Sequence, residues 1–139
     1  MNKFQFSEIV IGAEESFKVK IDSTMMDKFL EISRDSNPIH TDSEYARKKG
    51  FVDRLVYGLL TSSFYSTLVG VYLPGKYCIL HEVDVQFSSP VYIGDLLTIF
   101  GKVNYINESY RQLEIKASIT NQNNKRVSKA TLKTGFLDE

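Results

Sequence analysis

Polar and apolar residues alternate along five stretches of this chain. The stretches are residues 17–21, 79–87, 97–105, 113–119 and 130–136. A period of two is typical of strands with one buried face. The pattern therefore predicts one strand near the N-terminus and long strands in the C-terminal half, the last three of them consecutive and antiparallel.

Two helices are expected between the first strand and the middle of the chain. Met26, Phe29 and Leu30 lie on one stripe of a helix that Ser23 or Thr24 can cap. A shorter helix at residues 44–49, capped by Asp42 or Ser43, is expected to stop at Gly50.

The most apolar helix is predicted from Gly58 to Gly70. It carries Leu59, Leu60, Phe64, Leu68 and Val69, with Ser and Thr on its other faces. A helix this apolar, flanked by strands, is expected to lie against a sheet. One strand, short helices, an apolar helix and then long strands indicate an α+β fold in which the sheet wraps around a central helix. At 139 residues, the chain 1–139 is expected to form a single domain.

Composition narrows the possible functions. Lys plus Arg equals Asp plus Glu at 17 each, so no overall charge favours nucleic acid or an anionic membrane. No stretch approaches the roughly 20 apolar residues of a membrane span, and residues 1–10 lack a signal-peptide core. The single Cys78 is interpreted as an inert core residue, and no cluster of Cys and His predicts a metal. We therefore expect a cytoplasmic protein.

Candidate chemistry is concentrated in residues 33–42, Ser-Arg-Asp-Ser-Asn-Pro-Ile-His-Thr-Asp. Pro38 disfavours helical backbone at Asn37, so a turn is expected there. A tight turn would bring the carboxylate of Asp35 and the imidazole of His40 within reach of one water molecule, as a general acid and base require. The alternative is structural, because Asn-Pro is a common turn and a lone His near a turn is commonly solvated.

Asp35-x-Asn37-Pro38-Ile39-His40 resembles the signature of the MaoC-like, or R-specific enoyl-CoA hydratase, family. The resemblance covers most of the chain and continues through Phe51, Arg54, Gly58, Leu60, Phe87, Pro90, Val91, Gly94 and Asp95. It implies the hot-dog fold and a homodimer paired through sheet edges. Such pairing also covers an exposed edge strand.

The resemblance also implies an activity and its residues. Members hydrate trans-2-enoyl thioesters of coenzyme A or acyl carrier protein, or dehydrate R-3-hydroxyacyl thioesters, as lyases of fatty acid metabolism. Asp35 and His40 would be the catalytic pair, the amide of Gly58 would be the oxyanion donor, and no metal or redox cofactor would be required. Ser66 matches a serine near the catalytic acid.

The amide of Gly58 has a physical basis for this role, since the first N–H groups of a helix have no intrahelical partner. The alternative is that Gly58 only permits close packing. Asn37, Tyr57 and Leu59 are expected to contact the substrate together with Ser66.

Two positions depart from the family. Tyr57 stands where the family usually has His, which is expected to reshape the pocket mouth. Ser89 stands where a basic residue is common, so the means of holding the carrier is open.

Other candidates have two interpretations. Arg47, Lys48 and Lys49 either complement a helix dipole or meet the phosphates of a nucleotide-like ligand. His81, within a predicted strand, is interpreted as structural. A hot-dog thioesterase and a non-catalytic acyl-binding subunit remain as alternative functions.

Overall fold

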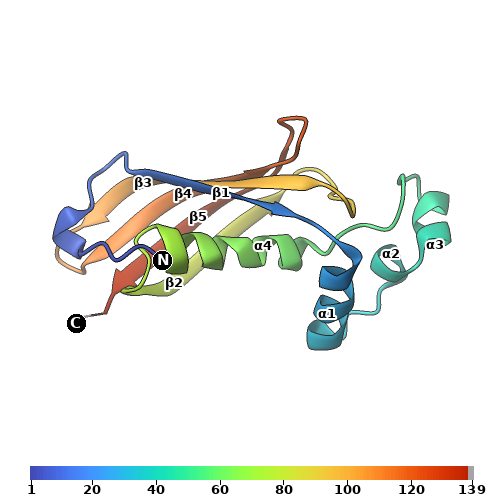
Figure 1. The fold of residues 1–139 in the computed structure, drawn as a ribbon, viewed down its shortest axis with the longest axis horizontal. Coiled ribbons are helices and arrows are strands. Elements are labelled where there is room, and N and C mark those ends of the chain that lie inside the picture. The colour runs from blue at the N-terminus through green and yellow to red at the C-terminus, as the bar shows by residue number, and fades with distance from the viewer. Residues whose placement is uncertain (138–139) are drawn as a thin grey trace.

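In the computed structural model, which describes residues 1–137, five antiparallel strands form one sheet, and a helix lies along one of its faces (Figure 1). The order across the sheet is β1-β3-β4-β5-β2. The strands are β1 (Glu14–Lys20), β2 (Cys78–Phe87), β3 (Leu96–Asn107), β4 (Gln112–Thr120) and β5 (Arg126–Phe136). The strands predicted from alternation are thus confirmed, with β1 and β2 at the two edges.

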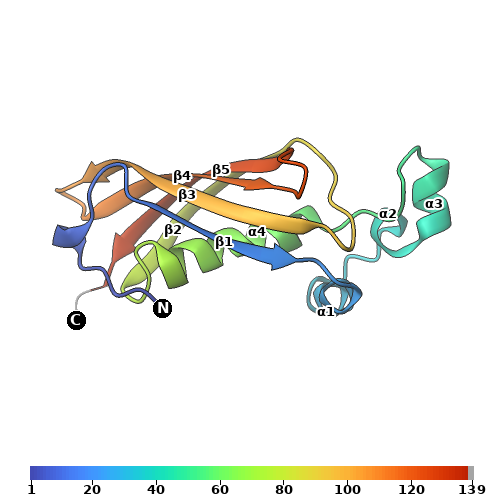
Figure 2. The ribbon, with the colours of Figure 1, turned by 45° about the horizontal axis from the view of Figure 1, so that its top comes forward.

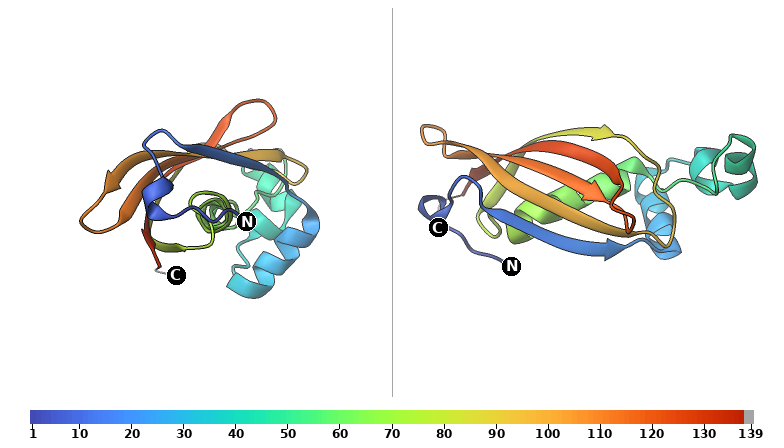
Figure 3. Two further views of the ribbon diagram at one scale, coloured as in Figure 1. Left: turned by 60° about the vertical axis from the view of Figure 1, so that its left-hand side comes forward. Right: turned by 90° about the horizontal axis from the view of Figure 1, so that it is seen from above.

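The helices fall into two groups (Figures 1 and 2). Those beyond one end of the sheet are α1 (Ser23–Ser33), α2 (Pro38–Thr41) and α3 (Ser43–Lys48). Those at the N-terminus and along the sheet are a 3-10 turn, η1 (Phe6–Glu8), the central helix α4 (Gly58–Thr67) and a π-helical turn, η2 (Leu68–Tyr72). The sheet curves around α4, and no helix covers its other face in this part of the chain (Figure 3). The predicted α+β arrangement of a sheet wrapped around a central helix is confirmed.

The core lies between α4 and the inner face of the sheet. Its fully buried side chains include Tyr65, Leu68, Leu97, Ile99, Leu113, Ile115, Ile119 and Leu132. Gly101 on β3 allows this packing, because a Cβ at that position would lie 2.6 Å from Cδ2 of Leu68 and 3.2 Å from Cγ2 of Ile115. The start of η2, directly after α4, therefore packs against β3 as closely as a residue without a side chain permits.

Three local predictions are corrected. Asp22, rather than Ser23 or Thr24, caps α1 by accepting a hydrogen bond from the amide of Met25 at 2.9 Å. The segment 38–41 is not an irregular turn but the one-turn helix α2. Pro38 starts this helix because its ring fits the first helical position, where no N–H is needed. The helix at residue 58 does not end at Gly70, because that glycine does not adopt the left-handed conformation of a helix stop and η2 runs through it.

We predict that Gly101→Ala destabilises the fold by about 1 to 3 kcal/mol, the usual cost of overpacking a core. Gly70→Ala is the matched control, because a Cβ at Gly70 meets nothing within 4 Å. Urea unfolding followed by circular dichroism measures both variants. Equal stability of the two would show that the contact with Leu68 does not limit the packing.

Candidate active site

A cavity of about 720 Å³ lies where α1, α2 and the first turn of α4 meet the end of β2. Five of the seven predicted site residues line it: Asp35, His40, Tyr57, Gly58 and Leu59. Asn37 and Ser66 are not among its lining residues. The cavity thus brings the segment of Asp35 and His40 together with the start of α4, which the sequence could suggest only through the family resemblance.

Asp35 is placed by the end of α1 and by two side-chain turns. Arg34 takes a left-handed conformation with φ 57°, and its amide bonds to the carbonyl of Leu30, which ends the helix. Oδ1 of Asp35 then accepts from the amide of Asn37 at 3.1 Å, and Oδ1 of Asn37 accepts from the amide of Ile39 at 3.0 Å. Asn37 therefore caps α2, and this hydrogen bond gives its side-chain oxygen a structural role.

His40 is held by a backbone carbonyl. Its Nδ1 lies 2.8 Å from the carbonyl oxygen of Leu55, which can only accept, so Nδ1 carries the proton. The Nε2 of the neutral ring is then the hydrogen-bond acceptor. The amide of Leu55 bonds in return to the carbonyl of Ile39 at 2.9 Å, so α2 is joined to the segment that leads into α4.

Tyr57 connects these parts of the site. Its ring stacks on His40 at a centroid distance of 4.2 Å and packs against Phe29 at 4.8 Å. Its hydroxyl donates to the backbone carbonyl of Asp35 at 2.8 Å, and only 2% of the residue is exposed. Burial raises the pKa of Tyr57, and the Asp35 carboxylate adds to the rise, so the phenol stays protonated as a donor.

Gly58 is the first residue of α4, and Tyr57 is its N-cap. A Cβ at Gly58 would lie 2.9 Å from Cε1 of Phe87, so the missing side chain lets the edge strand approach the helix. Within residues 1–137 the amide of Gly58 has no hydrogen-bond acceptor. Close packing and a free helix N-terminus therefore coexist at this residue.

Apolar side chains form most of the remaining wall. Phe29, Phe51, Leu59, Phe87 and Val91 line the cavity. Leu59 is 70% exposed and Phe87 is 54% exposed, so the cavity opens toward the free edge of β2. Neither Phe29 nor Val127 was among the predicted site residues, since neither carries a polar group that would mark a site.

The other chemical candidates lie outside the cavity. Ser66 is exposed on α4, two turns after Gly58, and its place in a network around Asp35 stays a prediction. His81 is exposed on β2 and shares a hydrogen bond of 2.8 Å with the side chain of Gln112. Burial raises the pKa of the Cys78 thiol to about 11, which keeps it protonated and unreactive at neutral pH.

The basic cluster at the end of α3 already has partners in the chain. Arg47 pairs with Asp53 at 3.1 Å and Lys48 with Glu44 at 2.7 Å. The Nζ of Lys49 lies 5.4 Å from the centroid of the Tyr45 ring. In the described residues 1–137, no group of three His, Cys, Asp or Glu side chains is placed to hold a metal ion, and none of the helices is long and apolar enough to cross a membrane.

Comparisons with known proteins identify the family. The model of the MaoC like domain matches residues 5–126. A mitochondrial 3-hydroxyacyl-[acyl-carrier-protein] dehydratase of Arabidopsis thaliana is 45% identical over 67 residues, 48% of this chain and 39% of the relative. An (R)-specific enoyl-CoA hydratase of Rhodospirillum rubrum is 33% identical over 93 residues, 67% of this chain and 65% of the relative. The matches thus span less than two thirds of either relative.

The fold is shared with a solved hydratase. The structure of R-hydratase PhaJ1 from Pseudomonas aeruginosa superposes with a TM-score of 0.89 at 25% identity, over 96% of this chain and 86% of that one. This similarity confirms the hot-dog fold. Because the family model covers most of its length, the chain belongs to the MaoC-like domain family.

Proposed function

We propose that this chain hydrates trans-2-enoyl thioesters, or dehydrates R-3-hydroxyacyl thioesters in reverse. The observation that carries the proposal is the joint placement of Asp35 and His40 on one largely apolar cavity. An apolar wall suits an acyl chain, which has no groups to hydrogen-bond. The coenzyme A and acyl-carrier-protein thioesters named for the similar proteins set the substrate class.

The reaction needs a held water and two proton transfers. Nε2 of His40 is an acceptor because Nδ1 is occupied by Leu55, and Oδ2 of Asp35 has no partner within residues 1–137. In our proposal these two atoms hold the water between them. As the water oxygen bonds to C3 of the substrate, its proton passes to the pair and the π electrons of the C2=C3 bond move into the enolate of the thioester. A proton from the pair then bonds to C2, which restores the thioester carbonyl.

Charge develops on the thioester oxygen during this step. The amide of Gly58, at the positive end of α4, is the donor that we assign to this oxygen. A preorganised donor of this kind costs no rearrangement when the charge appears. The missing side chain at Gly58 keeps the approach to the amide open.

We predict that Asp35→Asn and His40→Ala each lower kcat by about 10² to 10⁴, the usual contribution of a general acid or base. The double variant should lose little more than either single one, because the two residues act as one unit. Loss of enoyl absorbance with crotonyl-CoA measures the rate.

Asp27→Asn and His81→Ala are the matched controls, since both residues lie outside the cavity. A wild-type protein that binds crotonyl-CoA without hydrating it would favour a non-catalytic acyl-binding subunit. Release of free thiol from an acyl-CoA would favour a thioesterase.

We propose further that Tyr57 positions both members of the pair, through its hydroxyl on Asp35 and its ring on His40. Tyr57→Phe removes only the hydroxyl, so we expect kcat to fall about fivefold, as for one hydrogen bond of roughly 1 kcal/mol, with little change in KM. Tyr110→Phe is the control, because that ring is 78% exposed. An unchanged kcat in Tyr57→Phe would mean that the carboxylate keeps its position without this bond.

The free edge of β2 supports a homodimer. Ile79, Val83 and Phe87 on this strand are 43%, 43% and 54% exposed, and among the described strands β2 pairs only with β5. Light scattering should give a mass near twice 15.9 kDa. Val83→Lys should shift the protein toward monomer, because a charge on an edge strand opposes pairing. Tyr110→Lys, at an exposed turn, should stay dimeric, and a monomeric wild type would refute the proposal.

A further inference from the structure

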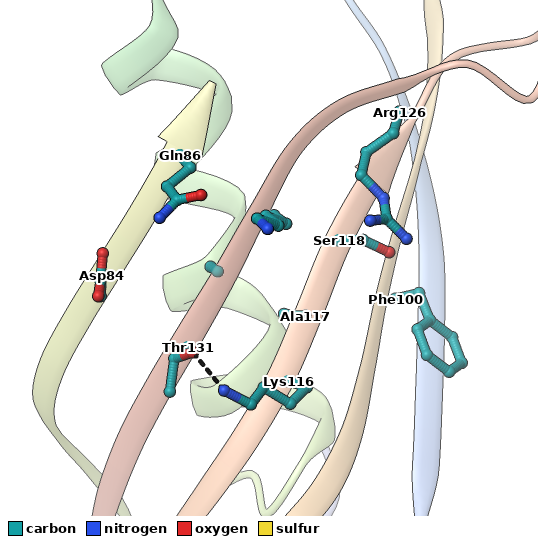
Figure 4. A pocket seen from close by; sticks show the side chains of 10 residues that line it. Asp84, Gln86, Phe100, Lys116, Ala117, Ser118, Arg126 and Thr131 are labelled. Carbon is teal, nitrogen blue, oxygen red and sulfur yellow. Dashed lines mark hydrogen bonds between the residues drawn. The ribbon is translucent and has the colours of Figure 1, made fainter. Parts of the chain in front are cut away.

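A second hollow lies on the sheet face opposite α4. Its volume is about 440 Å³, and it is centred on β4 and β5. Figure 4 shows it with α4 behind the strands, so its side chains project from the face that no helix covers. The cavity of the proposed reaction lies on the other face of the sheet.

The strand register explains why the hollow exists. Ser118 on β4 is directly opposite Lys129 on β5, and Lys116 is two residues away on the same face. Neighbouring strands are about 4.8 Å apart, and alternate residues of one strand are about 6.8 Å apart. Ser118 is short, so it leaves a depression with long cationic side chains around it.

A β-bulge brings a third cation to the hollow. Ile119 pairs with Ser128, whereas Thr120 pairs with Arg126, so Val127 is the extra residue. Without the bulge, Arg126 would face the opposite side of the sheet from Lys129, because side chains alternate along a strand. With it, Val127 lines the cavity while Arg126 lines the hollow and points toward Ser118 (Figure 4).

The hollow is positive although the chain as a whole is neutral. Lys116, Arg126 and Lys129 line it, against the single carboxylate of Asp84. Lys116 donates to Thr131 Oγ1 at 2.9 Å and lies 3.8 Å from Glu114. Within residues 1–137, the side chains of Arg126 and Lys129 have no hydrogen bond or ion pair. Two cations and the Ser118 hydroxyl are therefore free to bind an anion.

The hollow and the cavity approach each other at the end of β2. Gln86 lines the hollow, whereas the next residues, Phe87 and Ser88, line the cavity. Oγ of Ser88 donates to the backbone carbonyl of Arg126 at 3.0 Å. Ser89, where the family commonly has a basic residue, lines the cavity beside them.

We propose that this hollow binds a phosphate ester with at least two negative charges. The guanidinium fork of Arg126 matches two phosphate oxygens, Lys129 adds a point charge, and the Ser118 hydroxyl donates a hydrogen bond. Because the hollow lies near the cavity, we assign this phosphate ester to the carrier portion of the thioester substrate. This assignment to the carrier rests on the proposed function, whereas the binding of a phosphate ester does not.

Direct binding tests the site without any enzymatic activity. The probe is adenosine 3′,5′-bisphosphate, titrated calorimetrically at about 0.15 M salt, where weak surface attraction is screened. The double variant Arg126→Gln/Lys129→Gln should weaken binding about tenfold or more, since each lost charged hydrogen bond contributes that much. Lys18→Gln/Lys102→Gln removes two lysines of β1 and β3 that do not line the hollow and should bind as the wild type does. The proposed site would be overturned if the wild type did not bind the bisphosphate. It would also be overturned if both double variants lost the same affinity for it.

Kinetics distinguish the source of the phosphate. With crotonyl-CoA, the Arg126→Gln/Lys129→Gln variant should show a KM raised about tenfold, whereas the KM for crotonyl-pantetheine, which has no phosphate, should not change. A change with crotonyl-acyl carrier protein alone would overturn the assignment to a doubly charged ester, because the phosphodiester of its phosphopantetheine carries a single negative charge. Equal KM values with every carrier would overturn the assignment to the carrier. If the wild type hydrates none of these thioesters, the proposed function fails while the calorimetric result still decides the site.

Discussion

One hydrogen bond, from Nδ1 of His40 to the carbonyl of Leu55, joins the two segments on which the site depends. The first segment carries Asp35 and His40, and the second leads directly into Gly58. Because the amide of Leu55 also donates to the carbonyl of Ile39, one side-chain and one backbone hydrogen bond hold the two segments together. The same bond leaves Nε2 as the acceptor of the neutral imidazole. It therefore sets the tautomer of the proposed base and contributes to its position.

Tyr57 extends this connection to the carboxylate. The resemblance led us to expect a side chain that reshapes the pocket mouth, and the ring does line the cavity. Its larger role is internal, because its hydroxyl bonds to the backbone that carries Asp35 and its ring packs on His40. A buried, neutral phenol can make both contacts at once, and the raised pKa keeps it neutral. The departure from the family thus adds a rigid link to the site.

The local pattern of polar and apolar residues predicted the helices and strands well, but it predicted the side-chain contacts between them poorly. Alternation is a property of adjacent residues, so the strands and the apolar helix could be read directly from the chain. The cap at Asp22 was missed because three consecutive residues, Asp22, Ser23 and Thr24, can all accept the same bond. The bond from Tyr57 to Asp35 spans 22 residues, and nothing in either local sequence indicates it. That Asp35 and His40 line one cavity was predictable mainly because the motif resembles a known family.

The bulge at Val127 shows why the second hollow could not be predicted. Arg126 and Lys129 are three residues apart, and in a regular strand they would face opposite sides of the sheet. The extra residue reverses that expectation: Val127 joins the wall of the cavity, and the two cations share the outer face. If β5 were regular, Val127 would not line the cavity and Arg126 would not line the hollow. Bulges re-aim side chains, and this single irregularity couples the shape of the cavity beside α4 to the charge of the opposite face of the sheet.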